Sequence, residues 1–273
     1  MTDPRADFPS DVPDQSELVS MTREDDLVWL TIERPEVMNC LSFPTLKRLR
    51  TLCAEIAQDL TIRCVLITGS GEKSFCAGAD LKERKTMKPE RVPDFVRNIR
   101  RTMDDVEALP QPTIAVVNGF AFGGGTELLL ACDLRICAAH AQFGLTETTL
   151  AIIPGAGGTQ RLPRLIGKSR AKDLILTGRR IDGHEAERYG LVNRVAPEGE
   201  LKATALEVAR TIAGNGPVAV RAAKAAIDQG CELPQEQGLE VEASCYERTL
   251  PTQDRLEALA AFAEKRKPQY SGS

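Results

Sequence analysis

Short apolar runs alternate with helical repeats through the first two thirds of the chain. Continuous apolar runs at 64–68, 113–117 and 134–138 predict buried β-strands. Between them, apolar residues recur every three or four positions over 44–60 and 93–109, which predicts two amphipathic helices. Strands that alternate with helices in this way are typical of an α/β domain.

The beginning of the chain predicts a hairpin behind a mobile tail. Two β-type runs at 18–21 and 27–32 flank the polar segment 22–26, and Pro35 ends the second run. Residues 1–16 are acidic, rich in proline and poor in apolar side chains. Such a composition buries too little apolar surface to order a segment, so we expect a mobile tail there.

The pattern changes after residue 169, where helical repeats dominate and one strand, at 191–195, is predicted. Asp182 and Glu185 have the spacing of a helix capping box. The predicted helices are 170–176, 183–189, 201–213, 218–229, 235–250 and 254–265. We therefore expect an α/β core over 17–200 and a helical C-terminal region over 201–273 that packs against neighbouring subunits.

Composition narrows the class of protein. The chain has 273 residues, of which 42% are hydrophobic and 27% charged, as in soluble globular enzymes. Its net charge of −4 argues against nucleic acid as the main partner, because phosphate binding needs a concentrated positive surface. No apolar run reaches membrane-spanning length, and the first residues resemble neither a signal nor a transit peptide. We expect a cytoplasmic protein without membrane contact.

Cysteine and histidine usage restricts the chemistry. None of the eight cysteines forms a Cys-x-x-Cys pair, and most lie in apolar runs, which indicates reduced, buried thiols. With only His140 and His184, the chain has no histidine cluster, so we expect no metal site and no histidine-centred triad.

Candidate chemistry concentrates between residues 118 and 162. Three consecutive glycines at 123–125 open a predicted helix that carries Glu127, and a second glycine-rich loop spans 155–158. Glycine lets a ligand approach the backbone, and a helix N-terminus offers free N–H donors to negative charge. Each of these features also has a structural explanation. The glycines could form a tight turn, Glu127 could interact with the helix dipole, and Glu147 could lie beside a helix N-cap. Three consecutive glycines exceed what a turn needs, which favours an oxyanion site beside two acids.

Nucleotide and serine-hydrolase motifs are absent from the sequence. There is no Gly-x-Gly-x-x-Gly fingerprint and no Gly-x-Ser-x-Gly elbow. The Gly-Lys-Ser sequence at 167–169 lacks the upstream glycine of a phosphate-binding loop, since Leu162 occupies that position.

These motifs together resemble the crotonase (enoyl-CoA hydratase/isomerase) superfamily. The segment 118–128 reads Asn-Gly-x-Ala-x-Gly-Gly-Gly-x-Glu-Leu, and 153–162 reads Ile-Pro-Gly-Ala-Gly-Gly-Thr-Gln-Arg-Leu. Further segments that resemble landmarks of the family lie at 34–39, 75–80, 143–147, 176–178, 186–195 and 262–266. The resemblance extends over nearly the whole chain and is far more specific than any single glycine motif.

The resemblance implies an α/β fold built as a spiral of ββα units, with a helical C-terminal region that forms a homotrimer or a dimer of trimers. It also implies an acyl-CoA thioester as substrate and no cofactor apart from the coenzyme A of that substrate. The site residues that it implies are the oxyanion donors Ala77 and Gly124, the CoA and acyl path along Ala77, Gly78, Ala79 and Asp80, and Lys265 against CoA phosphate or ribose.

Two acids at family positions favour hydration. Hydratases of the family match acids at Glu127 and Glu147, whereas an isomerase that shuttles a proton can manage with one. We assign Glu127 to activate the attacking water and Glu147 to donate a proton to carbon. The alternatives are an enoyl-CoA isomerase, or a non-catalytic acyl-CoA-binding or RNA-binding member of the fold.

Local departures point to one branch of the family. Thr146 precedes Glu147 where many short-chain hydratases have proline, and Cys40 stands where alanine is usual. The segments that look closest to the methylglutaconyl-CoA hydratase branch are 80–84, 150–155, 160–164 and 251–256. We therefore predict an enoyl-CoA hydratase, with 3-methylglutaconyl-CoA as a named alternative substrate and fatty acid or branched-chain amino acid degradation as its setting.

Overall fold

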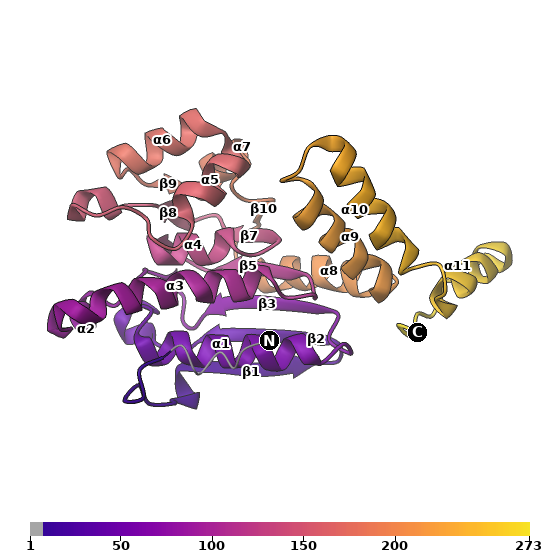
Figure 1. Ribbon diagram of the computed structural model, residues 1–273, viewed down its shortest axis with the longest axis horizontal. Coiled ribbons are helices and arrows are strands. Elements are labelled where there is room, and N and C mark those ends of the chain that lie inside the picture. Colours follow the sequence, from indigo (N-terminus) through magenta and orange to yellow (C-terminus); the bar gives the residue numbers. More distant parts are fainter. Residues whose placement is uncertain (1–7) are drawn as a thin grey trace.

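The larger of two sheets forms the centre of the computed structural model, which describes residues 8–273 (Figure 1). Within those residues its strand order is β1-β2-β3-β5-β7-β10. The strands are β1 (Val19–Glu24), β2 (Leu27–Ile32), β3 (Cys64–Gly69), β5 (Thr113–Val117), β7 (Leu134–Ala138) and β10 (Arg194–Ala196). β1 and β2 are antiparallel, which confirms the predicted hairpin, and the other neighbours are parallel.

The smaller sheet has the order β4-β6-β8-β9 in the described part of the chain. Its strands are β4 (Ser74–Cys76), β6 (Phe120–Phe122), β8 (Gln142–Gly144) and β9 (Ile181–Asp182). Three successive strand pairs, β3/β4, β5/β6 and β7/β8, each give one strand to either sheet before the chain enters a helix. This repetition is the ββα spiral that the sequence predicts.

Helices cover both faces of the larger sheet. On one face, α1 (Phe43–Gln58) and α3 (Val92–Glu107) bury their apolar stripes against alternate strand residues such as Val65 and Ile67. On the other face, α8 (Leu201–Ala213) packs Ala205, Ala209 and Ala213 on the remaining strand residues. α8, which begins just after the expected core boundary at residue 200, thus closes a second core layer on this sheet. The boundary itself stays a prediction.

The remaining helices surround the smaller sheet or extend away from the core. Figure 1 shows α9 and α10 as an antiparallel pair, with α11 at the far end of the molecule. The bounds are α2 (Leu81–Thr86), α4 (Gly124–Leu130), α5 (Gly158–Ile166), α6 (Lys168–Thr177), α7 (Gly183–Tyr189), α9 (Pro217–Gly230), α10 (Gln235–Glu247) and α11 (Gln253–Glu264). Short 3₁₀ turns are η2 (Ser16–Leu18), η3 (Pro35–Val37), η4 (Pro89–Arg91) and η5 (Glu147–Leu150).

Two local predictions differ from the structure around α7. The predicted strand 191–195 begins only at Arg194, because Gly190 ends α7 in the left-handed conformation and the N–H of Leu191 bonds back to the carbonyl of Ala186 at 2.8 Å. Only half of the capping box forms at the start of this helix. Asp182 accepts the N–H of Glu185, whose carboxylate pairs with an arginine instead of reaching back.

Part of the predicted tail packs against the body of the protein. Phe8 is buried with its ring edge against Phe43, and Asp11 forms two hydrogen bonds with Arg91 at 2.7 and 2.8 Å. These contacts connect the segment to α1 and to the start of α3. The sequence predicts a mobile tail over residues 1–16, but in the structure the acidic segment from Phe8 onward is held by the aromatic side chain of Phe8. Residues 1–7 lie outside the described residues.

All eight cysteines are free thiols, six of them buried, as the sequence predicts. Among the described residues, no helix has both the length and the apolar character needed to cross a membrane. The same part of the chain holds no group of three or more His, Cys, Asp and Glu side chains arranged to bind a metal ion.

Candidate active site

Glu127 is a buried carboxylate held by the backbone of a distant loop. It lies in α4, which begins at the triple glycine, and only 3% of its surface is exposed. Its Oε1 atom accepts the N–H groups of Ala156 and Gly158 at 2.7 and 2.8 Å. Gly158 also leaves the carboxylate its space, because a Cβ atom there would stand 3.0 Å from the same oxygen. Burial raises the pKa of Glu127 above its ordinary value, against the lowering effect of the two N–H donors.

Glu147 comes to the same site because β6 and β8 pair in parallel. This pairing places Gly123, whose N–H bonds to the carbonyl of Gly144, beside the turn that begins with Glu147. A Cβ atom on Gly123 would stand 3.1 Å from Oε1 of Glu147, and the φ of +51° at Gly123 suits only glycine. The second glycine loop and the triple glycine thus each make room for one acid.

The two acids differ in their surroundings. The Oε2 atom of Glu147 is buried and accepts no hydrogen bond from the described residues. Burial, and next the charge of Glu127, raises the pKa of Glu147 to about 7. One carboxylate is therefore fixed by two donors, whereas the other is free to exchange a proton near neutral pH.

The N–H of Ala77, expected as an oxyanion donor, is already engaged. It donates to the carbonyl of Met38 at 3.0 Å. Further along this strand-like segment, the carbonyl of Gly78 accepts the N–H of Leu41 at 2.8 Å, and the N–H of Asp80 donates to the carbonyl of Leu41 at 2.9 Å. The assignment of Ala77 is therefore corrected, since its hydrogen atom points into the fold.

The backbone nitrogen of Ala79 lies beside Gly124. Because its two neighbours bond to one side of the segment, the N–H of Ala79 points to the opposite side. The nitrogen of Ala79 lies 3.7 Å from the position that a Cβ on Gly124 would take. Gly78 makes the approach possible: its φ is +95°, and its own Cβ position lies only 3.2 Å from the nitrogen of Gly124.

A close backbone contact sets the distance between these two donors. A Cβ atom on Gly125 would stand 1.8 Å from the carbonyl oxygen of Cys76, which no real side chain could tolerate. The first turn of α4 therefore rests directly on the end of β4. Of the triple glycine, the outer two residues provide space and the middle one provides an N–H group at the helix start.

Asp80 has a structural task that the sequence did not reveal. Its carboxylate caps α2 by accepting the N–H groups of Lys82 and Glu83 at 3.0 and 3.1 Å, and it pairs with Arg34 at 2.9 Å. Burial raises the pKa of Asp80, but these hydrogen bonds and the arginine lower it further, so the net shift is downward. The place of Asp80 along the CoA and acyl path therefore stays a prediction, and its carboxylate is engaged within the chain.

Lys265 lies far from the two acids of its own chain. It is exposed at the C-terminal end of α11, and Figure 1 places that helix at the opposite end of the molecule from α4. The structure therefore brings together Glu127, Glu147, Gly124 and the 77–80 segment, but not Lys265. Sequence reasoning missed the N–H donors of Ala156 and Gly158, although the second glycine loop signalled an unusual backbone.

Comparisons with known proteins agree with this fold. The family described as "Enoyl-CoA hydratase/isomerase" matches residues 22–273. A crystal structure of enoyl-CoA hydratase from Bacillus anthracis is 53% identical, with a TM-score of 0.92 over 94% of this chain and 100% of that one. "Methylglutaconyl-CoA hydratase, mitochondrial" of Mus musculus is 46% identical over 278 residues, which cover 99% of this chain and 88% of that protein.

Fold and site define an α/β protein that places one buried glutamate and one partly buried glutamate beside backbone N–H groups. The chain belongs to the enoyl-CoA hydratase/isomerase family. The predicted resemblance to the crotonase superfamily and the predicted α/β fold are thereby confirmed.

Proposed function

We propose that this enzyme adds water across the 2,3 double bond of a 2-enoyl-CoA thioester. The observation that carries the proposal is the unequal pair of acids, Glu127 held by two N–H groups and Glu147 left with an unpartnered oxygen. Hydration needs one group that takes a proton and one that gives a proton. The names of the relatives, hydratases at about half identity, support the same reaction.

In the proposed reaction, the oxygen of water bonds to C3 of the thioester while Glu127 takes a proton from it. The electrons of the double bond move toward the thioester carbonyl, which becomes an enolate. Glu147 then gives its proton to C2, and the carbonyl re-forms. A pKa near 7 keeps part of Glu147 protonated at neutral pH. Burial raises the pKa of Glu127 as well, but its two N–H donors counter that rise.

The N–H groups of Ala79 and Gly124 are the proposed donors to the enolate oxygen. They lie side by side at the start of α4, whose positive end adds to the same field. Fixed donors need no reorganisation when charge develops, and the loss of one such donor typically costs about 10²–10³ in kcat. Ala79 replaces Ala77 in this role, and no cofactor beyond the coenzyme A of the substrate enters the proposal.

Substitution of each acid tests the proposal. We expect Glu127→Gln and Glu147→Gln each to lower kcat for crotonyl-CoA by about a hundredfold or more, since each removes one proton-transfer group. Loss of ultraviolet absorbance of the conjugated thioester measures the rate, and circular dichroism shows whether the variants fold. Near-normal turnover by either folded variant would remove that residue from the mechanism.

The acyl group requires a separate test. The 46% identical mouse protein is named for methylglutaconyl-CoA, which supports a branched, acidic substrate as the alternative to a simple enoyl chain. A panel of straight and branched 2-enoyl-CoAs would rank them by kcat/KM and would place the enzyme in fatty acid or branched-chain amino acid degradation. A 3-enoyl-CoA that yields only the 2-enoyl isomer would instead support an isomerase.

Exposed apolar side chains on the last helices support a homotrimer or a dimer of trimers. Phe262 is 86% exposed on α11, and the others are Leu239, Tyr246, Leu256 and Leu259. Surfaces of this kind are normally covered by a partner. In such an assembly the proposed contact of Lys265 with CoA phosphate would be made to a neighbouring copy. Sedimentation of the wild type and of Phe262→Glu measures the assembly, and a monomeric wild type would contradict it.

The eight free thiols support a reducing compartment, for which we propose the cytoplasm. Fractionation of cells that produce the protein would test this placement.

A further inference from the structure

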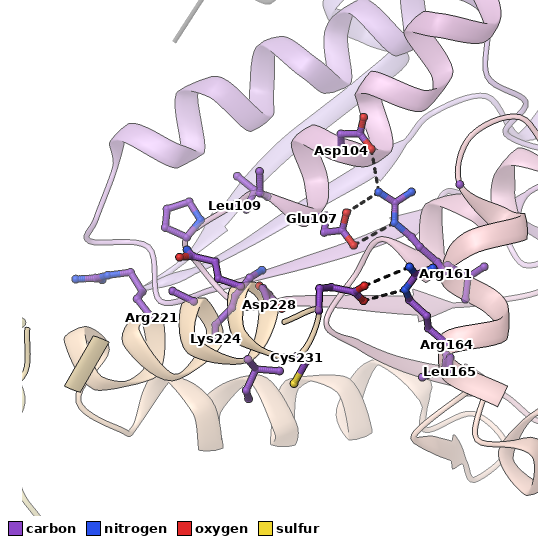
Figure 2. A pocket seen from close by; sticks show the side chains of 18 of the residues that line it. Asp104, Glu107, Leu109, Arg161, Arg164, Leu165, Arg221, Lys224, Asp228 and Cys231 are labelled. Carbon is purple, nitrogen blue, oxygen red and sulfur yellow. Dashed lines mark hydrogen bonds and ion pairs between the residues drawn. The ribbon is translucent and has the colours of Figure 1, made fainter. Parts of the chain in front are cut away.

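Arg161 in α5 connects three parts of the chain around the candidate site. Its Nε and Nη2 atoms donate to the carboxylate of Glu107 at 3.1 and 2.5 Å, and Nη2 also donates to Asp104 at 2.9 Å (Figure 2). Its Nη1 atom donates to the carbonyl of Ala156 at 3.0 Å. The side chain is only 14% exposed, at the edge of a pocket of about 1220 Å³ between α3, α5 and α9.

The loop under this guanidinium is the one that holds Glu127. Ala156 accepts a hydrogen bond from Arg161 through its carbonyl and donates one to Glu127 through its N–H. A Cβ atom on Gly157 would stand 2.1 Å from Nη1 of Arg161, so the guanidinium lies directly on the peptide. The φ of +106° at Gly157 turns the next N–H, that of Gly158, toward the same carboxylate oxygen.

Helix α3 touches this loop at two points. Asp104 and Glu107 reach it through Arg161, and Val96 lies against Gly155, where a Cβ atom would stand 3.1 Å from the valine side chain. The loop is thus fixed between α3 and the body of α5. Two carboxylates on one arginine give charge-assisted hydrogen bonds that are shorter and stronger than neutral ones.

We propose that Arg161 is a positioning residue that holds the 155–158 loop in the conformation in which its N–H groups orient Glu127. The inference rests on the proposed function, because it matters only if Glu127 takes part in proton transfer. Arg161 acts through the loop and not on the substrate. Its removal should therefore lower the rate of the chemical step more than it weakens substrate binding.

Arg164, three residues further along α5, provides a matched control. It is more exposed, and its guanidinium pairs with Glu232 at 2.8 and 3.2 Å, away from the 155–158 loop. Arg161→Met and Arg164→Met thus remove the same charge and the same kind of ion pair from one helix. Only the first removes a contact with the loop.

Steady-state kinetics with the 2-enoyl-CoA that the wild type hydrates fastest tests the inference. We expect Arg161→Met to lower kcat by about tenfold to a hundredfold with KM within about twofold, because small misplacements of a catalytic group cost this much. Arg161→Lys should recover part of the loss, since one ammonium can reach one acceptor but not all of them. Arg164→Met should keep wild-type kinetics.

Several outcomes would overturn the inference. Wild-type kcat in a folded Arg161→Met protein, an effect on KM alone, or an equal loss in Arg164→Met would each do so. If Arg161→Met does not fold, Glu107→Gln gives the same test through the other partner, and unchanged kcat there counts against the inference. If the wild type is active, Glu127→Gln is inactive and Arg161→Met has wild-type kinetics, only the positioning role of Arg161 is overturned. A wild type inactive on every thioester overturns the proposed function as well.

Discussion

Because Oε2 of Glu147 has no hydrogen-bond partner among the described residues, we expect Glu147→Gln to make the protein more stable above neutral pH and to remove its activity. Burial raises the folded-state pKa of Glu147 from 4.5 to about 7. Below pH 4.5 the group is protonated in both the folded and the unfolded chain. Between the two pKa values, the folded chain holds a proton that the unfolded chain has lost, so the free energy of unfolding falls as pH rises. Glutamine carries no such dependence.

The size of the effect follows from the two pKa values. A shift of about 2.5 units corresponds to about 3 kcal/mol in total, of which about 2.5 kcal/mol falls between pH 5 and pH 8. From pH 5 to pH 8, the free energy of unfolding of the wild type should therefore fall by about 2.5 kcal/mol more than that of Glu147→Gln. The charge of Glu127 contributes to the shift, so part of the gain reflects relief of repulsion between the two acids.

Urea unfolding at pH 5 and pH 8, at one protein concentration, measures the difference. The same comparison for Glu72→Gln, an exposed residue in the turn after β3, is the control and should show little change. An equal stability difference between wild type and Glu147→Gln at both pH values would refute the reasoning. Such a result would mean that Glu147 is ionised in the folded protein at pH 5, and the proposed proton donor would lack its proton.

Two further predictions concern rate and packing. The kcat/KM for hydration should fall as pH rises through about 7, because Glu147 then loses the proton that it must donate; a flat pH–rate profile from pH 6 to 9 would contradict this. Gly125→Ala should destabilise the protein by about 1–3 kcal/mol or more, because the new methyl group meets the carbonyl of Cys76 and must push α4 away from β4. Thermal unfolding measures the loss of stability. The kcat should fall as well, because the N–H groups of Ala79 and Gly124 move apart. Wild-type stability together with wild-type kcat would count against the close contact.

The long elements were predictable because their patterns repeat. The expected helices 183–189 and 201–213 have the bounds of α7 and α8, and the first apolar runs became β3, β5 and β7. The three-residue strands β4, β6 and β8 were not predicted, since a periodic signal needs more residues than they contain. These short strands place the site, because β4 leads to Ala79, β6 to the triple glycine and β8 to Glu147.

The choice between Ala77 and Ala79 shows a second limit of the sequence. Both residues are alanines in the same segment, and the resemblance alone led to Ala77. What separates them is the direction of their N–H groups, since that of Ala77 bonds to Met38 while the residues on either side of Ala79 bond to Leu41. Backbone direction is set by pairing with a distant segment, so no local residue type records it.

The contrast between the two acids originates in the backbone. Both are glutamates, and each has a glycine beside its carboxylate, Gly158 for Glu127 and Gly123 for Glu147. Gly158 begins a helix and turns its N–H toward the carboxylate, whereas the N–H of Gly123 is used by the carbonyl of Gly144. Burial raises the pKa of both acids, but two N–H groups of a distant loop counter the rise only at Glu127, whereas the charge of Glu127 adds to it at Glu147. We therefore propose that the roles of base and acid depend on which glycine N–H reaches the carboxylate, more than on the two side chains themselves.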